Sequence, residues 1–227
     1  MKVERRTLSS ENMRATRTSE SDRAIEGYAA TFDSETIIGG LYRERIAPGA
    51  FDTVNDGPIV ATFNHDVNWT IGSTRSGTCA VEVTDTGLHY RVNVPDGPIG
   101  DHVLAITERG DLGGSSFAFV PHANGERWVD PSGDETLPLR VLESVLVFDV
   151  SAVVNPAYES SSVSVAEARS VLEGYQTNKQ DQGDQTVEAA SGAAAVEVTE
   201  PDAGTENRRR RLALHEKLAR GSAWVKM

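Results

Sequence analysis

Apolar and polar residues alternate with a period of two over several segments of the chain, a pattern that predicts β-strands. The clearest pair is Cys79–Val83 and Leu88–Val94, which flank the polar segment Thr84-Asp85-Thr86-Gly87 and should form a hairpin with a short glycine-containing loop. Further strands are predicted at Val3–Leu8, Ala24–Phe32, Tyr42–Ile46, Ile59–Phe63, Leu112–Val120 and Leu139–Val154, the last of them bent or split in two.

Helical periodicity is weaker and confined to a few places. Val103, Leu104 and Ile106 recur at a spacing of three to four residues within Gly100–Arg109, and Gly110 follows as a helix-ending residue. Further helices are predicted at Ala50–Val54 and Val163–Leu172. A strand-rich body with a few helices predicts an α+β fold.

The composition changes after Gly174. Residues 174–206 contain seven Asp or Glu and one Lys, a balance of −6, whereas residues 207–227 contain seven Lys or Arg and one Glu, a balance of +6. A segment so poor in apolar residues cannot offset its ordering entropy, so 174–206 is predicted to be disordered. Arg208–Arg220 has helical character. The chain should therefore comprise a folded domain at 1–173, an acidic linker at 174–206 and a basic, helix-prone peptide at 207–227.

Composition and charge exclude several classes of protein. The 227 residues carry a net charge of −12, which argues against sequence-specific nucleic-acid binding, although Arg208–Arg211 could contact DNA by charge alone. No apolar run approaches the ~20 residues of a membrane span, and the start of the chain lacks a signal-peptide pattern. The single cysteine, Cys79, suits a reducing compartment, so a cytosolic location is expected. Neither a metal-binding spacing nor a phosphate-binding loop is present, and no cofactor is expected.

Two short segments carry candidate chemistry. His65 follows an apolar strand within Phe63-Asn64-His65-Asp66, and Gly113-Gly114 precedes Ser115, Ser116 and Phe117. A serine becomes a nucleophile when an imidazole accepts its proton. Adjacent strand residues face opposite sides, so only one of the two serines can meet His65; if Phe117 and Phe119 point into the core, Ser116 is that residue. Backbone N–H groups near Gly113–Ser116 are candidates for an oxyanion hole.

A third group would orient the imidazole and stabilise its protonated form. Asp149 is the best candidate, because it lies in the otherwise apolar segment Val145–Val150, where an unpaired charge would be costly. Glu143, Asp66 and His89 remain alternatives.

Several short motifs in one order resemble a known family. They are Gly27-Tyr28-Ala29, Ile46-Ala47-Pro48-Gly49-Ala50-Phe51, Asn64-His65-Asp66, Ile71-Gly72, Asp85-Thr86-Gly87-Leu88, Ser116-Phe117-Ala118-Phe119, Asp149-Val150-Ser151-Ala152-Val153 and Asn155-Pro156-Ala157. From about Gly27 to Val165 the chain resembles the prohead, or capsid maturation, proteases of tailed phages, which are related in fold to the herpesvirus assemblins. The family commonly has Gly in place of Ala118 and often Glu in place of Asp149.

The resemblance implies a closed or nearly closed assemblin-like β-barrel with peripheral helices. It also implies a serine endopeptidase with His65 as general base, Ser116 as nucleophile and Asp149 as third member. Such an enzyme would cleave the scaffold segment of the major capsid protein, internal scaffold and itself, inside the procapsid in the host bacterial cytoplasm. The acidic and basic tail lies outside the resemblance and is a candidate tether to scaffold or portal.

Two other functions remain open at this point. The same fold could serve as a catalytically silent assembly protein, because a fold does not determine a function. A phage or bacterial β-barrel interaction module with a basic tail would show no dependence on Ser116. The presence of a His, a Ser and an acid at the expected positions favours the enzyme.

Overall fold

The structure, a computed structural model, describes residues 3–9, 13–17, 23–54, 56–154 and 165–189. The chain divides into two compact units, residues 1–180 and 181–227. Of the second unit, the described residues are 181–189, which form the last turns of a helix. Within the described residues, no helix is both long and apolar enough to cross a membrane.

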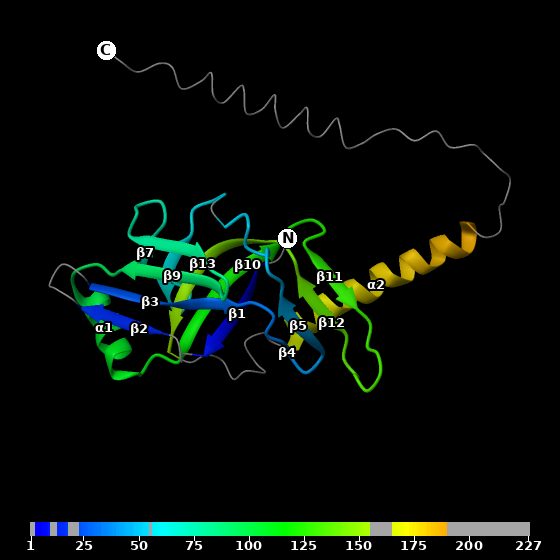
Figure 1. Cartoon of the computed structure of the whole chain (residues 1–227), viewed down its shortest axis with the longest axis horizontal. Helices are drawn as coiled ribbons and strands as arrows, with labels where there is room; N and C mark the ends of the chain where they lie inside the picture. The colour runs from blue at the N-terminus through cyan, green and yellow to red at the C-terminus, as the bar shows by residue number, and fades with distance from the viewer. Residues whose placement is uncertain (1–2, 10–12, 18–22, 55, 155–164, 190–227) are drawn as a thin grey trace, which may run out of the picture. The chain divides into compact units, whose positions relative to one another are not determined.

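The strands of the first unit form three sheets (Figure 1). The first has the order β1 (Glu4–Ser9), β10 (Gly114–Pro121), β13 (Val145–Val153), β6 (Val60–Phe63) and β7 (Asp66–Ser73). The second has the order β2 (Arg14–Arg17), β3 (Arg23–Thr31), β9 (Gly87–Asn93) and β8 (Cys79–Val83). The third has the order β11 (Glu126–Val129), β12 (Leu139–Leu142), β5 (Tyr42–Ile46) and β4 (Thr36–Ile38). Neighbouring strands are antiparallel except β13 with β6 and β12 with β5, which are parallel.

The main hydrophobic core draws most of its side chains from the first and second sheets. Phe117 and Phe119 of β10 are fully buried in it, together with Ile25 of β3 and Tyr90 of β9. Because strand side chains alternate between faces, Ser116 and Ala118 lie on the opposite face of β10 from the two phenylalanines. That opposite face is also covered, since every residue of β10 from Gly114 to Val120 is buried.

Helix α1 (Pro98–Arg109) packs against β2, β3 and β7 and lies at one end of β2 and β3 in Figure 1. Pro98 begins the helix, where its missing N–H has no intrahelical partner to lose. Gly110 ends it in the left-handed conformation, with φ 77°, and its N–H bonds the carbonyls of the last turn. The helix and glycine cap predicted from the sequence are therefore confirmed.

Helix α2 (Val165–Ala189) is longer than predicted. The sequence predicts a helix ending at Leu172 and disorder from Gly174, but the helix continues through residue 189. Tyr175 stacks on Trp128 with ring centroids 4.6 Å apart, and Lys179 Nζ lies 2.7 Å from both carboxylate oxygens of Asp130. These contacts supply partners that the local sequence pattern does not reveal.

Three other expectations differ from the structure. The strands of the described residues form three sheets rather than one closed barrel, so the α+β class holds but the barrel does not. Ala50–Val54 forms successive turns instead of a helix, with Val54 N bonded to Phe51 O. Residues 126–129, where the sequence pattern predicts no strand, form β11, which pairs with β12. The predicted split of Leu139–Val154 is confirmed as β12 and β13.

Candidate active site

His65 occupies a tight hairpin turn between β6 and β7. Phe63 and Asp66 pair across the two-residue turn, and both Asn64 and His65 have positive φ values, 53° and 57°. Such a two-residue turn needs left-handed backbone at both central positions, which is uncommon for residues other than glycine. Strained backbone of this kind is retained where surrounding contacts enforce it.

Contacts to β13 enforce the conformation of this turn. The Asn64 N–H donates to the Ala152 carbonyl at 2.9 Å, and the Asn64 side-chain oxygen accepts from the Val154 N–H at 3.0 Å. The His65 N–H donates to Ser151 Oγ at 2.8 Å. The turn is therefore attached at three points to β13 and to Val154, the residue that follows it, which gives the imidazole of His65 a defined position.

The imidazole of His65 faces Ser116. His65 Nε2 lies 2.6 Å from Ser116 Oγ, although the two residues are 51 positions apart in the sequence. Ser115 points to the other face of β10, where its Oγ lies 2.9 Å from the Tyr90 hydroxyl in the core. Of the two neighbouring serines, the structure thus brings Ser116 to His65, as the alternation of faces predicts.

Asp149 lies on the other side of the imidazole. Its Oδ1 is 3.5 Å from His65 Nδ1, longer than a normal hydrogen bond. Nδ1 is buried and has no hydrogen-bond partner among the described residues, so the carboxylate is placed to receive its N–H. With the proton on Nδ1, Nε2 is free to accept the proton of Ser116.

The other candidates for the third position make contacts with other residues. Glu143 pairs with Arg127, whose Nε lies 2.8 Å from Oε1 of Glu143. Asp66 accepts the backbone and side-chain N–H groups of Asn68 at 2.9 Å each. His89, on β9, forms an edge contact with the ring of Tyr28.

Two buried hydroxyl residues complete the site and were not predicted to belong to it. Thr62 Oγ1 lies 3.1 and 3.0 Å from the two carboxylate oxygens of Asp149 and 3.1 Å from Ser151 Oγ. Ser151 of β13 lies opposite Thr62 of β6 on one side and opposite Ser116 of β10 on the other. Ser151 follows Asp149 by two residues and so shares its face, which is a signal the sequence contains; the neighbouring position of Thr62 depends on sheet pairing.

The arrangement contains a nucleophile, a base and a carboxylate in the order that acyl transfer by a serine uses. Gly113, one of the candidate oxyanion donors, already donates its N–H to the Val153 carbonyl at 3.0 Å.

Among the described residues, no group of three or more His, Cys, Asp or Glu side chains is arranged to hold a metal. The burial of Cys79 raises the pKa of its thiol to about 12, so this thiol stays protonated and is a poor nucleophile.

Comparisons with known proteins place the chain in a family. No curated protein matches it. Among solved structures, the capsid assembly protease of bacteriophage T4, gp21, is similar over 67% of this chain and 97% of its own, with 13% identity and a TM-score of 0.44. The family model of caudovirus prohead serine proteases matches residues 10–178, a span that includes His65, Ser116 and Asp149. The chain therefore belongs to the caudovirus prohead serine protease family, and it is a serine protease of phage capsid maturation.

Proposed function

We propose that Ser116 is the nucleophile of this capsid maturation protease, with His65 as general base and Asp149 as the group that orients the imidazole. The observation that carries the proposal is the 2.6 Å separation of Ser116 Oγ and His65 Nε2, with Asp149 at 3.5 Å from the opposite ring nitrogen. This order of nucleophile, base and carboxylate is the recurring geometry of serine hydrolases.

The residues perform the reaction in two steps. Ser116 Oγ attacks the carbonyl carbon of the scissile peptide bond while its proton passes to His65 Nε2. The imidazolium, stabilised by Asp149, then gives that proton to the leaving amine, and an acyl-enzyme remains on Ser116. A water molecule, deprotonated by His65, hydrolyses the ester and restores the hydroxyl.

The substrates proposed for this activity are the scaffold segment of the major capsid protein, internal scaffold proteins and the chain itself. The site of action is the interior of the procapsid in the host cytoplasm. The opposite charges of 174–206 and 207–227 support a role of the tail as a tether to scaffold or portal, by charge attraction.

The test compares Ser116→Ala with Ser115→Ala in the full chain, incubated with a scaffold-derived polypeptide. Because both serines are buried neighbours on one strand, Ser115→Ala controls for the effect of removing a hydroxyl from β10. Loss of cleavage in Ser116→Ala and retention in Ser115→Ala are expected. The reverse result would show that Ser115, and not Ser116, is the nucleophile. Cleavage by both variants would mean that neither serine is the nucleophile.

A further inference from the structure

The candidate nucleophile is covered by the first strand of the chain. Ser116 is 1% exposed. The carbonyl oxygen of Arg6 lies 2.8 Å from Ser116 Oγ, and Thr7 Oγ1 lies 3.3 Å from it. Both residues belong to β1, which pairs with β10 from Glu4 opposite Phe119 to Ser9 opposite Gly114. A substrate carbonyl cannot approach Ser116 while this strand remains in place.

The position of β1 is the one that a peptide substrate would need. The carbon of the reacting carbonyl must come to about 3–3.5 Å from the attacking oxygen. Extended peptides commonly bind by adding a strand to a sheet edge. β10 pairs with β13 on one side and with β1 on the other. A substrate strand could therefore pair with β10 only in the place that β1 occupies. The Ser116 hydroxyl donates a hydrogen bond to the Arg6 carbonyl at 2.8 Å, so β1 already holds a backbone carbonyl group beside Ser116.

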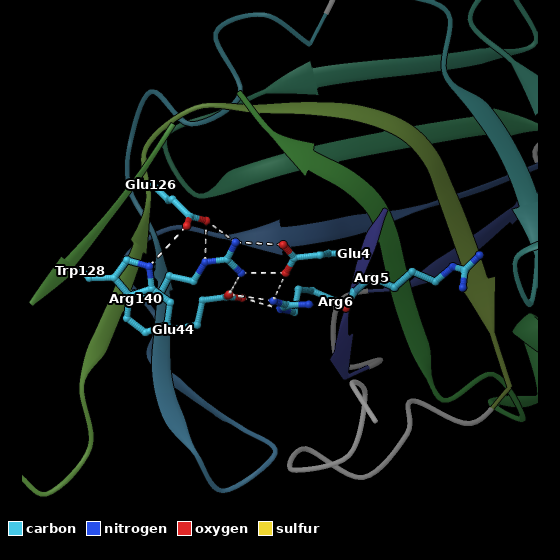
Figure 2. Close-up of polar contacts among 7 residues, drawn as sticks. All are labelled: Glu4, Arg5, Arg6, Glu44, Glu126, Trp128 and Arg140. Atoms are coloured by element: carbon cyan, nitrogen blue, oxygen red, sulfur yellow. Dashed lines mark hydrogen bonds and ion pairs between the residues drawn. The ribbon is translucent and has the colours of Figure 1, made fainter. Parts of the chain in front are cut away.

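The side chain of Arg6 indicates which residue this place accepts. Its guanidinium bonds both carboxylate oxygens of Glu44, with Nη2 at 2.7 Å from Oε2 (Figure 2). The same guanidinium lies over the ring of Phe119. Glu44 is only 4% exposed, and its remaining guanidinium partner is Arg140, at 3.0 Å from Oε2. When Arg6 leaves, Glu44 Oε1 loses its partner in a buried setting, which favours another cation.

The charges left behind by β1 lead to the same conclusion. Arg140 bonds Glu4 of β1 through both terminal nitrogens, at 2.7 and 2.9 Å, and also bonds Glu44 and Glu126 (Figure 2). Removal of β1 takes away one anion, Glu4, and one cation, Arg6. Arg140 then faces two carboxylates, so the vacated place carries an excess negative charge. A cleft beside β1, lined by Arg6, Thr7, Leu8, Glu44 and Phe117 among others, gives a side chain access to it.

We propose that the edge of β10 is the substrate-binding site, that β1 occupies it as an intramolecular substrate-like strand, and that Glu44 accepts a basic side chain of the substrate residue preceding the scissile bond. The inference rests on the proposed role of Ser116 as nucleophile. Substrate binding then requires displacement of β1, and the buried ion pairs of Arg6 and Glu4 set how readily the strand leaves. An arginine or lysine of the substrate replaces Arg6 against Glu44.

Displacement of β1 is tested through the accessibility of Ser116 to an alkyl fluorophosphonate, which phosphonylates activated serines. Arg5→Pro in the full chain removes a backbone N–H and constrains the strand, whereas the exposed Arg5 side chain points away from the ion pairs in Figure 2. Arg5→Ala is the matched control with an intact backbone. Labelling at Ser116 should be about tenfold faster or more in Arg5→Pro, and within about twofold of wild type in Arg5→Ala.

The outcomes separate the inference from the function on which it rests. Equal labelling rates in wild type and Arg5→Pro would overturn the covering role of β1 while leaving Ser116 as nucleophile. Absence of labelling at Ser116 in every variant would contradict the proposed function, and the inference with it. Circular dichroism and thermal melting of each variant show whether Arg5→Pro retains the fold; if it does not, Glu4→Gln, which weakens the bond to Arg140 without altering the backbone, is measured in its place.

The basic subsite is tested with a peptide library whose cleavage products are read by mass spectrometry. Wild-type enzyme should cleave after Arg or Lys at least about tenfold more often than after the neutral Gln, and Glu44→Gln should reduce this ratio to about threefold or less. Cleavage by wild type without preference for a basic residue, or an unchanged preference in Glu44→Gln, would overturn the assignment of Glu44.

Discussion

The Thr62 hydroxyl lies 3.1 and 3.0 Å from the two carboxylate oxygens of Asp149, the same carboxylate that stands 3.5 Å from His65 Nδ1. Thr62 is fully buried on β6, and Asp149 lies on the parallel neighbouring strand β13. The hydroxyl can donate one hydrogen bond, so it limits rotation of the carboxylate and directs the remaining oxygen at the imidazole. We therefore propose that Thr62 acts on the candidate site through Asp149, as a positioning residue.

Thr62→Val should lower kcat by about 10- to 100-fold with little change in KM, because the isosteric side chain keeps its volume but cannot hold the carboxylate. Thr62→Ser retains the hydroxyl and should recover most of the activity. Steady-state kinetics on one peptide substrate measure both parameters. A similar loss in Thr62→Ser would point to packing rather than to the hydrogen bond.

Substitution of Asp149 should act mainly on the chemical step. Asp149→Asn keeps the shape but provides no charge for the imidazolium, and kcat is expected to fall by about two to four orders of magnitude. Glu143→Gln, which removes a surface partner of Arg127, is the control and should leave kcat unchanged. Near-normal activity of Asp149→Asn would move the third role to another group.

Ser116 and His65 should behave as one unit in a double-mutant cycle. Ser116→Ala and His65→Ala are each expected to lower kcat about a thousandfold or more, and the double variant should be no slower than either single variant. Thermal melting provides the control for folding, because the His65 turn is held by backbone contacts that the substitution retains. Losses that multiply in the double variant would mean that the two residues act independently.

The ion pairs of β1 should make the stability of this strand sensitive to acid. Burial by itself raises the pKa of Glu4, but the hydrogen bonds and charges of Arg140 and Arg6 outweigh it and hold the pKa below its usual value of 4.5. A lowered folded-state pKa stabilises the fold above the unfolded pKa, and this contribution is lost as the pH falls through the folded value. Fluorophosphonate labelling of Ser116, measured relative to the rate of the Arg5→Pro variant at each pH, should rise below about pH 4.5 in wild type. Glu4→Gln should lose this pH dependence.

Self-cleavage is predicted within residues 174–211, which separates the basic peptide from the body. If Glu44 selects basic residues, the cut should follow one of Arg208–Arg211. Mass spectrometry of purified wild type against Ser116→Ala distinguishes self-cleavage from host proteolysis. A shortened chain in both would assign the cut to another protease.

Truncation of the tail tests the proposed tether. The extent of α2 determines the residue at which the truncation should begin. A truncation at 174 removes Tyr175 and Lys179, which contact Trp128 and Asp130. Deletion of residues 190–227 spares these contacts and should retain peptidase activity while lowering incorporation into proheads. Deletion of 175–227 should also lower the melting temperature. Equal incorporation of the chain lacking 190–227 would exclude the tether.

Most of the strands and the choice of candidate residues follow from the sequence by itself, whereas β2, β4, β7 and β11 are not predicted from it. Alternation over Cys79–Val83 and Leu88–Val94 predicts the hairpin of β8 and β9, because one face of each strand must be apolar to join a core. The same alternation distinguishes Ser116 from Ser115, since Phe117 and Phe119 must face inward. A charged residue within the apolar run of β13 identifies Asp149, because such a charge needs a partner.

Other features arise only from contacts between segments far apart in the chain. Glu4, Glu44, Glu126 and Arg140 come from four strands in two sheets, and no local pattern predicts that their charges meet. The continuation of α2 past Gly174 is stabilised by Trp128 and Asp130, which contact Tyr175 and Lys179. Intrinsic helix propensity alone predicts no helix there. The position of β1 over Ser116 likewise depends on the order of strands in the sheet, which sequence periodicity does not encode. A period of two determines which face of the sheet a side chain occupies. Pairing between strands determines which residues lie beside that side chain.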